Sequence, residues 1–208
     1  MARGETPGGI VRRRLQRTPP LKGNLRGGHT RIAIASGKGG TGKTLVATNL
    51  AATTEGATLV DLDVEEPNCY IFAKAESEHA EEVFRPVPTV DPRKCTLCGN
   101  CAKVCEFHAI AVLPEKVMVF DELCHGCGAC TTLCPEGAIA EHGHLMGEVV
   151  TANGGLMDLV YGRLRVGEAA ATPLIRRVKE TARNRGVTIM DCPPGTACTA
   201  VESIKGSD

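Results

Sequence analysis

The chain has 208 residues, of which 42% are hydrophobic, 23% are charged and only 3% are aromatic. This composition excludes a mostly disordered or collagen-like chain and predicts a core of aliphatic side chains. The formal charge is zero, but residues 1–31 hold eight basic side chains against one acid, which leaves a net charge of −7 on the remainder. An acidic body has no electrostatic footprint for nucleic acid, so we expect no nucleic-acid partner.

Eleven cysteines are the most unusual feature of the composition. The early arginines are not followed by an apolar signal segment, and no stretch of about 18 apolar residues is present to span a membrane. We therefore expect a cytoplasmic protein without a membrane segment. In a reducing compartment, clustered thiols bind metal or carry out redox chemistry more often than they form disulfides.

The first elements in chain order indicate an α/β domain. Residues 1–30, rich in Arg, Gly and Pro, predict a disordered basic tail, which is either a flexible extension or an arm for an acidic partner. We expect an apolar strand over 31–36, a helix over about 43–54 and a buried strand over 57–63. Strand, helix and strand in this order form the unit of a parallel sheet, so residues 31–68 are its first part.

This pattern is interrupted after Asn68. Residues 69–86 predict a linker in which Glu and Ala give way to prolines, and residues 87–141 are a Cys-rich insertion. The α/β pattern resumes over 142–208, as the second part of the same domain. The elements expected there are a strand over 159–166, a helix over 173–185 and a strand over 187–191.

Two cysteine runs, 29 residues apart, occupy the insertion. Each has the C-x2-C-x2-C-x3-C spacing in which three thiolates of one loop hold three corners of an iron–sulfur cluster and the fourth reaches the neighbouring cluster. Zinc is the alternative, but zinc sites draw two ligands from each of two separated knuckles. The spacing thus predicts two [4Fe–4S] clusters, one bound by Cys95, Cys98, Cys101 and Cys134, the other by Cys124, Cys127, Cys130 and Cys105.

Residues 91–140 resemble the two-cluster bacterial ferredoxin family along their whole length. The resemblance implies one-electron transfer at low potential with a redox partner protein. One departure is that Pro135 follows Cys134 whereas Glu106 follows Cys105. This difference affects the local turn and leaves the ligands themselves in place.

A glycine-rich run between the first strand and the first helix matches G-x4-G-K-S/T. Its residues are Gly37, Lys38, Gly39, Gly40, Thr41, Gly42, Lys43 and Thr44. Such glycines let successive backbone N–H groups turn toward phosphates, and the helix N-terminus adds positive potential. We expect Lys43 to neutralise the β- and γ-phosphates of ATP and Thr44 to bind Mg²⁺.

The additional lysine, Lys38, makes this run resemble the deviant Walker A motif of the MinD/ParA/Mrp ATPases. Residues 61–68 resemble the switch I of that superfamily, and residues 191–196 resemble its Walker B motif and switch II. The resemblance implies a P-loop NTPase sheet and an ATP-dependent homodimer in which Lys38 reaches the phosphates of the partner.

The same resemblance implies roles for three further residues. Asp63 would orient the attacking water, Asp191 would hold Mg²⁺ through water, and Gly195 would donate its N–H to the γ-phosphate. A turn cap after a strand is the alternative for Asp63. Asp191 stands at the carboxyl end of an apolar strand, where α/β proteins bind their ligands.

Residues 31–208 as a whole resemble MinD-superfamily ATPases with an inserted ferredoxin domain. The expected fold class is therefore α/β, a P-loop NTPase parallel sheet with an inserted α+β ferredoxin-like domain. Members of that superfamily continue past switch II, so we expect the chain to be truncated at its C-terminus. The remaining cysteines, Cys69, Cys192 and Cys198, are either small packed side chains or, near switch II, ligands of a cluster at a dimer interface.

The leading hypothesis for function is an ATPase whose nucleotide state gates electron transfer through its own clusters. A second hypothesis is an iron–sulfur carrier or assembly ATPase of the Mrp type, but all eight ligands lie in one chain, which favours stable clusters over transferable ones. A third is a MinD-like positioning ATPase that acts on a membrane or a partner protein.

Overall fold

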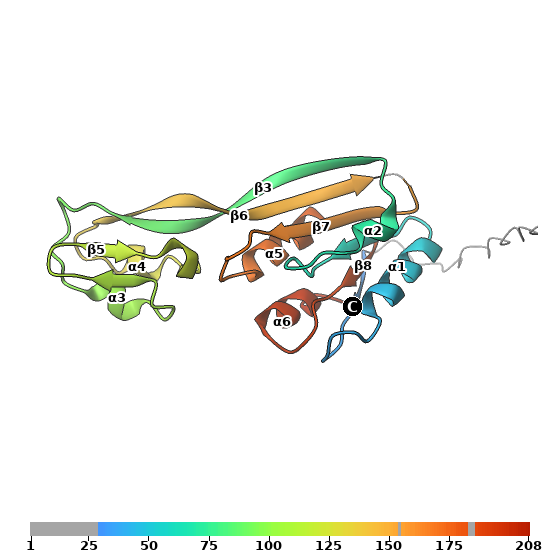
Figure 1. Ribbon diagram of the computed structural model, residues 1–208, viewed down its shortest axis with the longest axis horizontal. Helices are drawn as coiled ribbons and strands as arrows, with labels where there is room; N and C mark the ends of the chain where they lie inside the picture. Colours follow the sequence, from blue (N-terminus) through green and yellow to red (C-terminus); the bar gives the residue numbers. More distant parts are fainter. Residues whose placement is uncertain (1–28, 154, 183–185) are drawn as a thin grey trace, which may run out of the picture.

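The computed structural model describes residues 29–153, 155–182 and 186–208 of the chain (Figure 1). The basic tail predicted over 1–30 lies outside this part of the chain, apart from His29 and Thr30, and Thr30 is the first residue of a strand. The end of the helix predicted over 173–185 also falls outside the described residues. Figure 1 shows an elongated molecule with a larger body at one end and a small cysteine-containing module at the other.

A six-stranded mixed sheet forms the body, in the order β1-β8-β2-β7-β6-β3. Four of its strands run parallel to one another, β6 runs antiparallel to its neighbour β7, and the edge strand β3 runs antiparallel to β6. The strands are β1 (Thr30–Ile34), β2 (Thr58–Asp61), β3 (Ser77–Val90), β6 (Ile139–Asn153), β7 (Asp158–Leu164) and β8 (Val187–Asp191).

Helices cover both faces of this sheet. One face packs on α1 (Lys43–Thr53) and α2 (Tyr70–Ala73), where Ala47, Ala51 and Ala73 join Leu59 and Ile189 in a buried cluster. The opposite face packs on α5 (Thr172–Thr181), which is followed after β8 by α6 (Cys198–Ile204).

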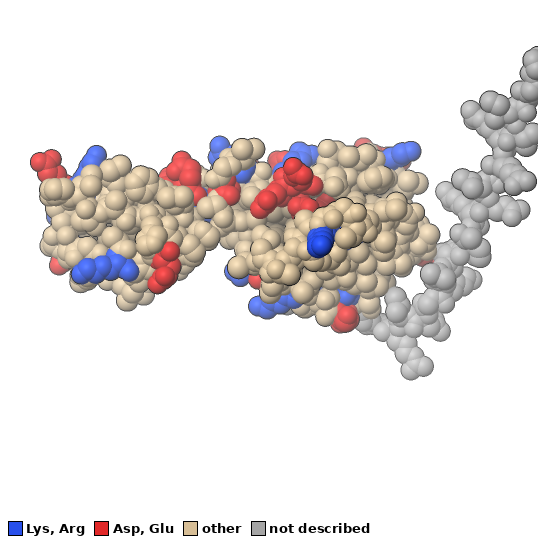
Figure 2. All heavy atoms as spheres, turned by 60° about the horizontal axis from the view of Figure 1, so that its bottom comes forward, with Lys and Arg blue, Asp and Glu red and all other residues tan. Residues whose placement is uncertain are grey.

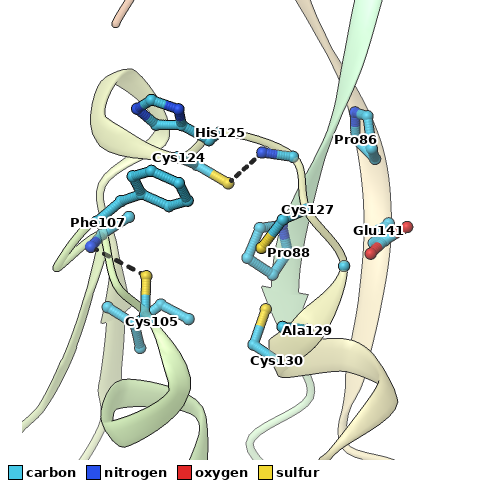
Figure 3. Close-up of a pocket in the computed structure, with 14 residues that line it drawn as sticks. Pro86, Pro88, Cys105, Phe107, Cys124, His125, Cys127, Ala129, Cys130 and Glu141 are labelled. Carbon is cyan, nitrogen blue, oxygen red and sulfur yellow. Dashed lines mark hydrogen bonds between the residues drawn. The ribbon is translucent and has the colours of Figure 1, made fainter. Parts of the chain in front are cut away.

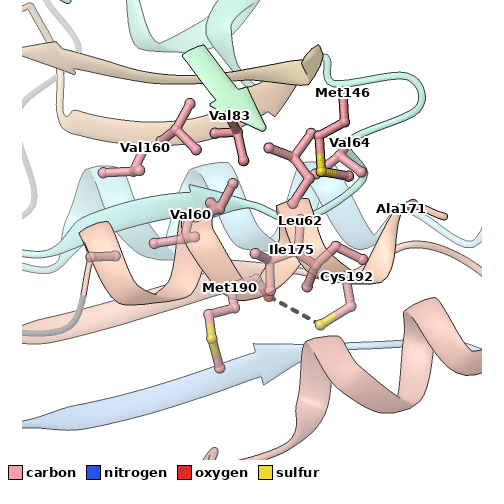
Figure 4. Packing of buried hydrophobic residues seen from close by; sticks show 14 residues of the cluster. Val60, Leu62, Val64, Val83, Met146, Val160, Ala171, Ile175, Met190 and Cys192 are labelled. Carbon is pink, nitrogen blue, oxygen red and sulfur yellow. Dashed lines mark hydrogen bonds between the residues drawn. The ribbon is translucent and has the colours of Figure 1, made fainter. Parts of the chain in front are cut away.

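The core beneath α5 consists of aliphatic side chains, as the composition predicts (Figure 4). Leu174, Ile175 and Val178 form the apolar side of α5, at the i, i+1, i+4 spacing that places residues on one helix face. They pack on Val60 and Met146 of the sheet. Burying each such side chain contributes about 1.5–3 kcal/mol.

The prediction that residues 69–86 form an irregular linker is wrong, because this segment has regular secondary structure. This segment contains α2 and the first ten residues of β3, a strand of 14 residues that pairs with β6 from end to end. Proline lacks the N–H that a central strand must donate, which is why Pro86 and Pro88 indicated a loop. β3 is the edge strand of the sheet, where a missing donor is tolerated.

The β3–β6 pair is also the physical connection between the body and the module. Residues 77–83 of β3 belong to the body, and residues 86–90 run along the module, with a register irregularity between Val83 and Phe84. The module adds α3 (Asn100–Val104), β4 (Ile110–Val112), β5 (Val117–Val119), the 3-10 helix η1 (Asp121–Leu123) and α4 (Ala129–Thr132). Figure 2 shows a narrow waist where the two parts meet. Within the described residues, every helix is too short or too polar to cross a membrane.

Candidate functional site

The module contains two hollows, each lined by four cysteine side chains. We call them proximal and distal according to their distance from the body along β3. The proximal hollow lies beside Pro86 and Pro88, and the distal hollow lies beside Val90. The proximal cysteines are Cys105, Cys124, Cys127 and Cys130. The distal cysteines are Cys95, Cys98, Cys101 and Cys134.

These two groups of four are the same groups that the ferredoxin spacing predicts. Cys105 follows the last residue of α3 and reaches the proximal hollow, whereas Cys101 in the first turn of α3 lines the distal hollow. The short helix therefore carries the chain from one site to the other. Figure 3 shows the four proximal side chains around a common space, and all eleven cysteines of the chain are free thiols.

Backbone geometry brings the loops close around the sulfur atoms. Gly99 and Gly128 precede α3 and α4 with φ values of 78° and 72°, a conformation that side chains other than glycine rarely adopt. In each hollow, backbone N–H groups donate to sulfur. Such bonds run from Ala109 to Cys105 (3.3 Å), from Gly126 to Cys124 (3.4 Å) and from Ala138 to Cys134 (3.4 Å).

A thiol must lose its proton to act as a metal ligand, and nearby positive charge stabilises the thiolate that forms. Burial raises the pKa of Cys101 and of Cys130. Burial also raises the pKa of Cys124, where the N–H of Gly126 and the positive charge of Arg85 act in the opposite direction. Iron supplies the charge that a buried thiolate needs, so the donor set of four cysteines fits a four-iron cluster in each hollow.

A second group of predicted residues lies in the body, at the carboxyl ends of β1, β2 and β8. The glycine-rich run connects β1 to α1, and α1 begins at Lys43. Gly40 and Gly42 have positive φ values of 71° and 87°, which favour glycine. At Gly37 and Gly39 an added Cβ atom would meet no atom within 4 Å, and neither residue has a positive φ angle. The fold of the protein itself therefore does not require glycine at these two positions.

Thr44 and Asp191 are in direct contact. The hydroxyl of Thr44 donates to Oδ2 of Asp191 at 2.5 Å, and the thiol of Cys69 approaches the same oxygen at 3.5 Å. The other carboxylate oxygen of Asp191, Oδ1, is buried without a hydrogen-bond partner in the described part of the chain. Burial raises the pKa of Asp191, and the bond from Thr44 opposes the shift.

Asp61, which we did not predict as a site residue, organises the loop that carries Asp63. It is fully buried, and its carboxylate accepts backbone N–H bonds from Asp63, Asn68 and Cys69, each at 3.0 Å. Burial raises the pKa of Asp61 despite these bonds. Its signal in the sequence was an acidic residue at the end of an apolar strand, the same signal that singled out Asp191.

Asp63 itself lies half-buried at this edge. Burial and the negative charges of Asp61 and Asp191 raise its pKa to about 6. Gly195, predicted to donate to a phosphate, donates its N–H to the carbonyl of Ser36 at 3.1 Å, and the hydroxyl of Ser36 donates to the carbonyl of Lys38 at 2.6 Å.

The three remaining cysteines have different surroundings. Cys69 and Cys192 are buried in the two cores of the body, and burial raises the pKa of Cys192 to about 11. Cys198, the first residue of α6, is exposed. Packing as small side chains therefore accounts for two of the three.

Comparison with known proteins identifies part of the module. Residues 94–139 match the family described as the 4Fe-4S dicluster domain. This region is thus a dicluster iron–sulfur domain, and the chain binds iron–sulfur clusters. The match supports electron transfer and does not extend to the body.

Longer relatives occur in an archaeon. An uncharacterized protein of Methanocaldococcus jannaschii is 32% identical over 184 residues, which are 86% of this chain and 64% of the relative. A second uncharacterized protein of that organism is 28% identical over 85% of this chain and 66% of its own length. This chain therefore spans just under two thirds of either relative. A Staphylococcus aureus protein provisionally named formate dehydrogenase is 28% identical over 75 residues, 8% of its length.

Proposed function

We propose that this protein binds and hydrolyses ATP and that its nucleotide state gates electron transfer through two [4Fe–4S] clusters. The observation that carries the electron-transfer half is the convergence of eight cysteines in two groups of four within a dicluster domain. We assign the proximal and distal cysteines as the ligands of the two clusters. A bound four-iron cluster supplies reversible one-electron transfer.

The nucleotide half of the proposal rests on the edge of the sheet where β1, β2 and β8 end. Gly37 and Gly39 leave their surface open to a ligand, which is the condition under which a phosphate can approach the backbone closely. Lys43 at the start of α1 is assigned to the β- and γ-phosphates, and its charge already acts on Asp191.

Thr44 and Asp191 support a Mg²⁺ site at the same edge. Their side chains touch, so one ion could contact the hydroxyl and face the carboxylate, and Oδ1 of Asp191 lacks a partner among the described residues. Asp63 would hold the attacking water. A carboxyl with a pKa of about 6 is close to neutral pH, which suits a group that orients or accepts a proton.

Gating requires that the nucleotide edge and the module influence each other. Gly195 donates to Ser36 in this structure, so donation to a phosphate would first break that bond and move the loop after β8. The carbonyl of Val64, next to Asp63, accepts the N–H of Leu164 at 2.8 Å, at the end of β7 nearest the waist. A change at Asp63 thus has a short packed route toward the module.

The proposed dimer, with Lys38 reaching the phosphates of a second copy, follows from the same assignment. Lys38 lies in an exposed loop, so its side chain can extend away from its own body. Asp63, Glu65 and Glu66 surround a cleft of about 220 Å³ together with Pro193 and Pro194, which brings the two proposed switch loops onto one surface.

The test is anaerobic reconstitution followed by iron counting and EPR of the dithionite-reduced protein, with and without Mg-ATP. We expect about eight irons per chain, as two four-iron clusters require. We also expect ATP hydrolysis and an EPR spectrum that changes when Mg-ATP is added. Eight irons with no binding or hydrolysis of ATP would leave the electron-transfer half and eliminate the nucleotide half.

A further inference from the structure

A buried ion pair occupies the waist between the body and the module. Arg85 lies on β3, and its side chain is only 1% exposed. Its Nε donates to Glu168, which is 5% exposed and lies between β7 and α5, at 3.0 Å. Glu168 also contacts His144 of β6 at 2.8 Å. Charged side chains are rarely this buried unless they are paired.

Arg85 is tied directly to the loop that begins the proximal site. Its Nη2 donates to the carbonyl of Asp121 at 2.6 Å, and the same carbonyl accepts the backbone N–H of Cys124 at 3.1 Å. The next residue of β3, Pro86, packs so closely on Gly126 that an added Cβ there would lie 3.0 Å from the Pro86 carbonyl oxygen. A single carbonyl group therefore separates the guanidinium from the backbone of a proposed cluster ligand.

The charge of Arg85 is only partly neutralised by its neighbours. Its Nη1 atom is buried and has no hydrogen-bond partner in the described residues. Glu168 divides its carboxylate between Arg85 and His144. The carboxylate of Asp121 faces His142 and His144, each at 3.8 Å, rather than Arg85.

Arg85, which precedes Pro86 but does not itself line the proximal hollow, is the only Lys or Arg that is buried among the described residues. The distal site therefore has no equivalent buried cation in this part of the chain. The only charged side chain that lines it is the acidic Glu136, just as the acidic Glu141 lines the proximal hollow. The nearby Arg93 is 88% exposed and pairs with Asp91, so water screens its charge. The two sites are thus matched in cysteines and acids, and the proximal site differs by His125 in its lining and by the buried guanidinium of Arg85 beside it.

We propose that Arg85 raises the reduction potential of the proximal cluster above that of the distal cluster, and that Glu168 moderates this effect. The inference rests on the ligands assigned under the proposed function. Reduction by an external one-electron donor, such as dithionite or a redox partner, adds one negative charge to a cluster without making or breaking a bond to the protein. A cation in a low-dielectric site stabilises that added charge.

An ordered path for electrons follows from this difference. An electron that enters at the distal site would pass to the proximal site and rest there, next to the waist and nearest the body. The Arg85–Glu168 pair would then set the reduction potential of the proximal cluster through its charge, without being one of the cluster ligands.

The test compares midpoint potentials of the two clusters, measured by EPR-monitored redox titration of the full chain without nucleotide. The variants C124S and C98S, which each remove a ligand of one site, identify the signal that belongs to the other. We expect R85M to shift the proximal potential to a more negative value and E168Q to shift it to a more positive value. The distal potential should stay unchanged in both variants, and in the exposed control R93M.

Opposite shifts distinguish an electrostatic role from a structural one, because both substitutions disturb the same packing. Iron counting accompanies each titration. If R85M binds fewer than about eight irons, the electrostatic role of Arg85 is tested with E168Q and with R85K, which retains the positive charge. We expect R85K to keep the wild-type order of potentials. Equal shifts at both sites, shifts of the same sign in R85M and E168Q, or no shift at eight irons would overturn the inference. Failure of wild-type protein to bind eight irons would instead overturn the ligand assignment.

Discussion

The cysteine module and the proposed nucleotide edge of the body differ in how nearly complete their sites are. In the module, the predicted ligands already surround two common spaces. At the nucleotide edge, the predicted groups bind one another, since Thr44 donates to Asp191 and Gly195 donates to Ser36. The module therefore needs only its clusters, whereas nucleotide binding at the proposed edge would exchange internal bonds for bonds to the ligand. A site of the second kind can change conformation when the ligand arrives or leaves.

The largest effect that separates the two regions is expected from Lys43→Ala. Loss of the ammonium group removes the charge assigned to the phosphates, so ATP hydrolysis should fall to background while the iron content stays at about eight per chain. Phosphate release and iron assays on the same sample measure both. Lys116→Ala, in the exposed turn between β4 and β5, is the matched control. Hydrolysis at the wild-type rate in Lys43→Ala would remove this edge as the ATP site.

The complementary change is Cys124→Ser in the proximal hollow. Removing one ligand should reduce the bound iron to roughly half of the wild-type content, since four of about eight irons belong to each site. ATP binding should persist. Cys192→Ser, at a buried cysteine outside both hollows, should retain all the iron. Equal iron loss in both variants would mean that the two hollows do not act as separate sites.

A smaller effect is expected at Asp61, which supports the nucleotide edge from within. Asp61→Asn replaces a carboxylate that accepts three backbone N–H bonds by an amide with only one accepting oxygen. We expect a loss of about 1–3 kcal/mol in the free energy of unfolding, the cost of leaving buried donors unsatisfied. Chemical denaturation measures it, and the variant should keep its iron. Stability equal to wild type would show that these bonds do not hold the loop.

The smallest effect concerns the pH dependence of stability through Asp63. Its folded-state pKa is about 6 and its ordinary value is 3.8, so the folded state binds the proton more tightly than the unfolded state. The stability contributed by that proton is present below about pH 4 and is lost as the pH rises through about 6. Asp63→Asn should match wild type near pH 4 and be more stable at pH 7, measured without Mg²⁺. The opposite difference at pH 7 would show that Asp63 is stabilised in its charged form.

The cysteines of the two hollows could be grouped from the sequence because the relevant geometry is local. Four cysteines within eleven residues fix a loop, and the rule that the fourth ligand crosses to the other site needs only the short helix α3. The parallel strands β2 and β8 were equally accessible, since each has an apolar centre that ends at an aspartate, a pattern that belongs in a buried parallel sheet.

The connection between the two regions could not be predicted in the same way. Pro86 and Pro88 indicated a loop because edge strands and loops tolerate the same residue, and only the pairing with β6 distinguishes them. Arg85 and Glu168 are 83 residues apart and become partners only through the sheet. Asp61 was overlooked because its role depends on the path of the following loop, which local pattern does not determine.

The central claim is that nucleotide at one end of the molecule changes the clusters at the other. The most direct measurement is the midpoint potential of each cluster in wild-type protein with and without Mg-ATP, repeated in Lys43→Ala. The account predicts that Mg-ATP shifts at least the proximal potential in wild type and shifts neither potential in Lys43→Ala. Unchanged potentials in wild-type protein that demonstrably binds ATP would contradict it.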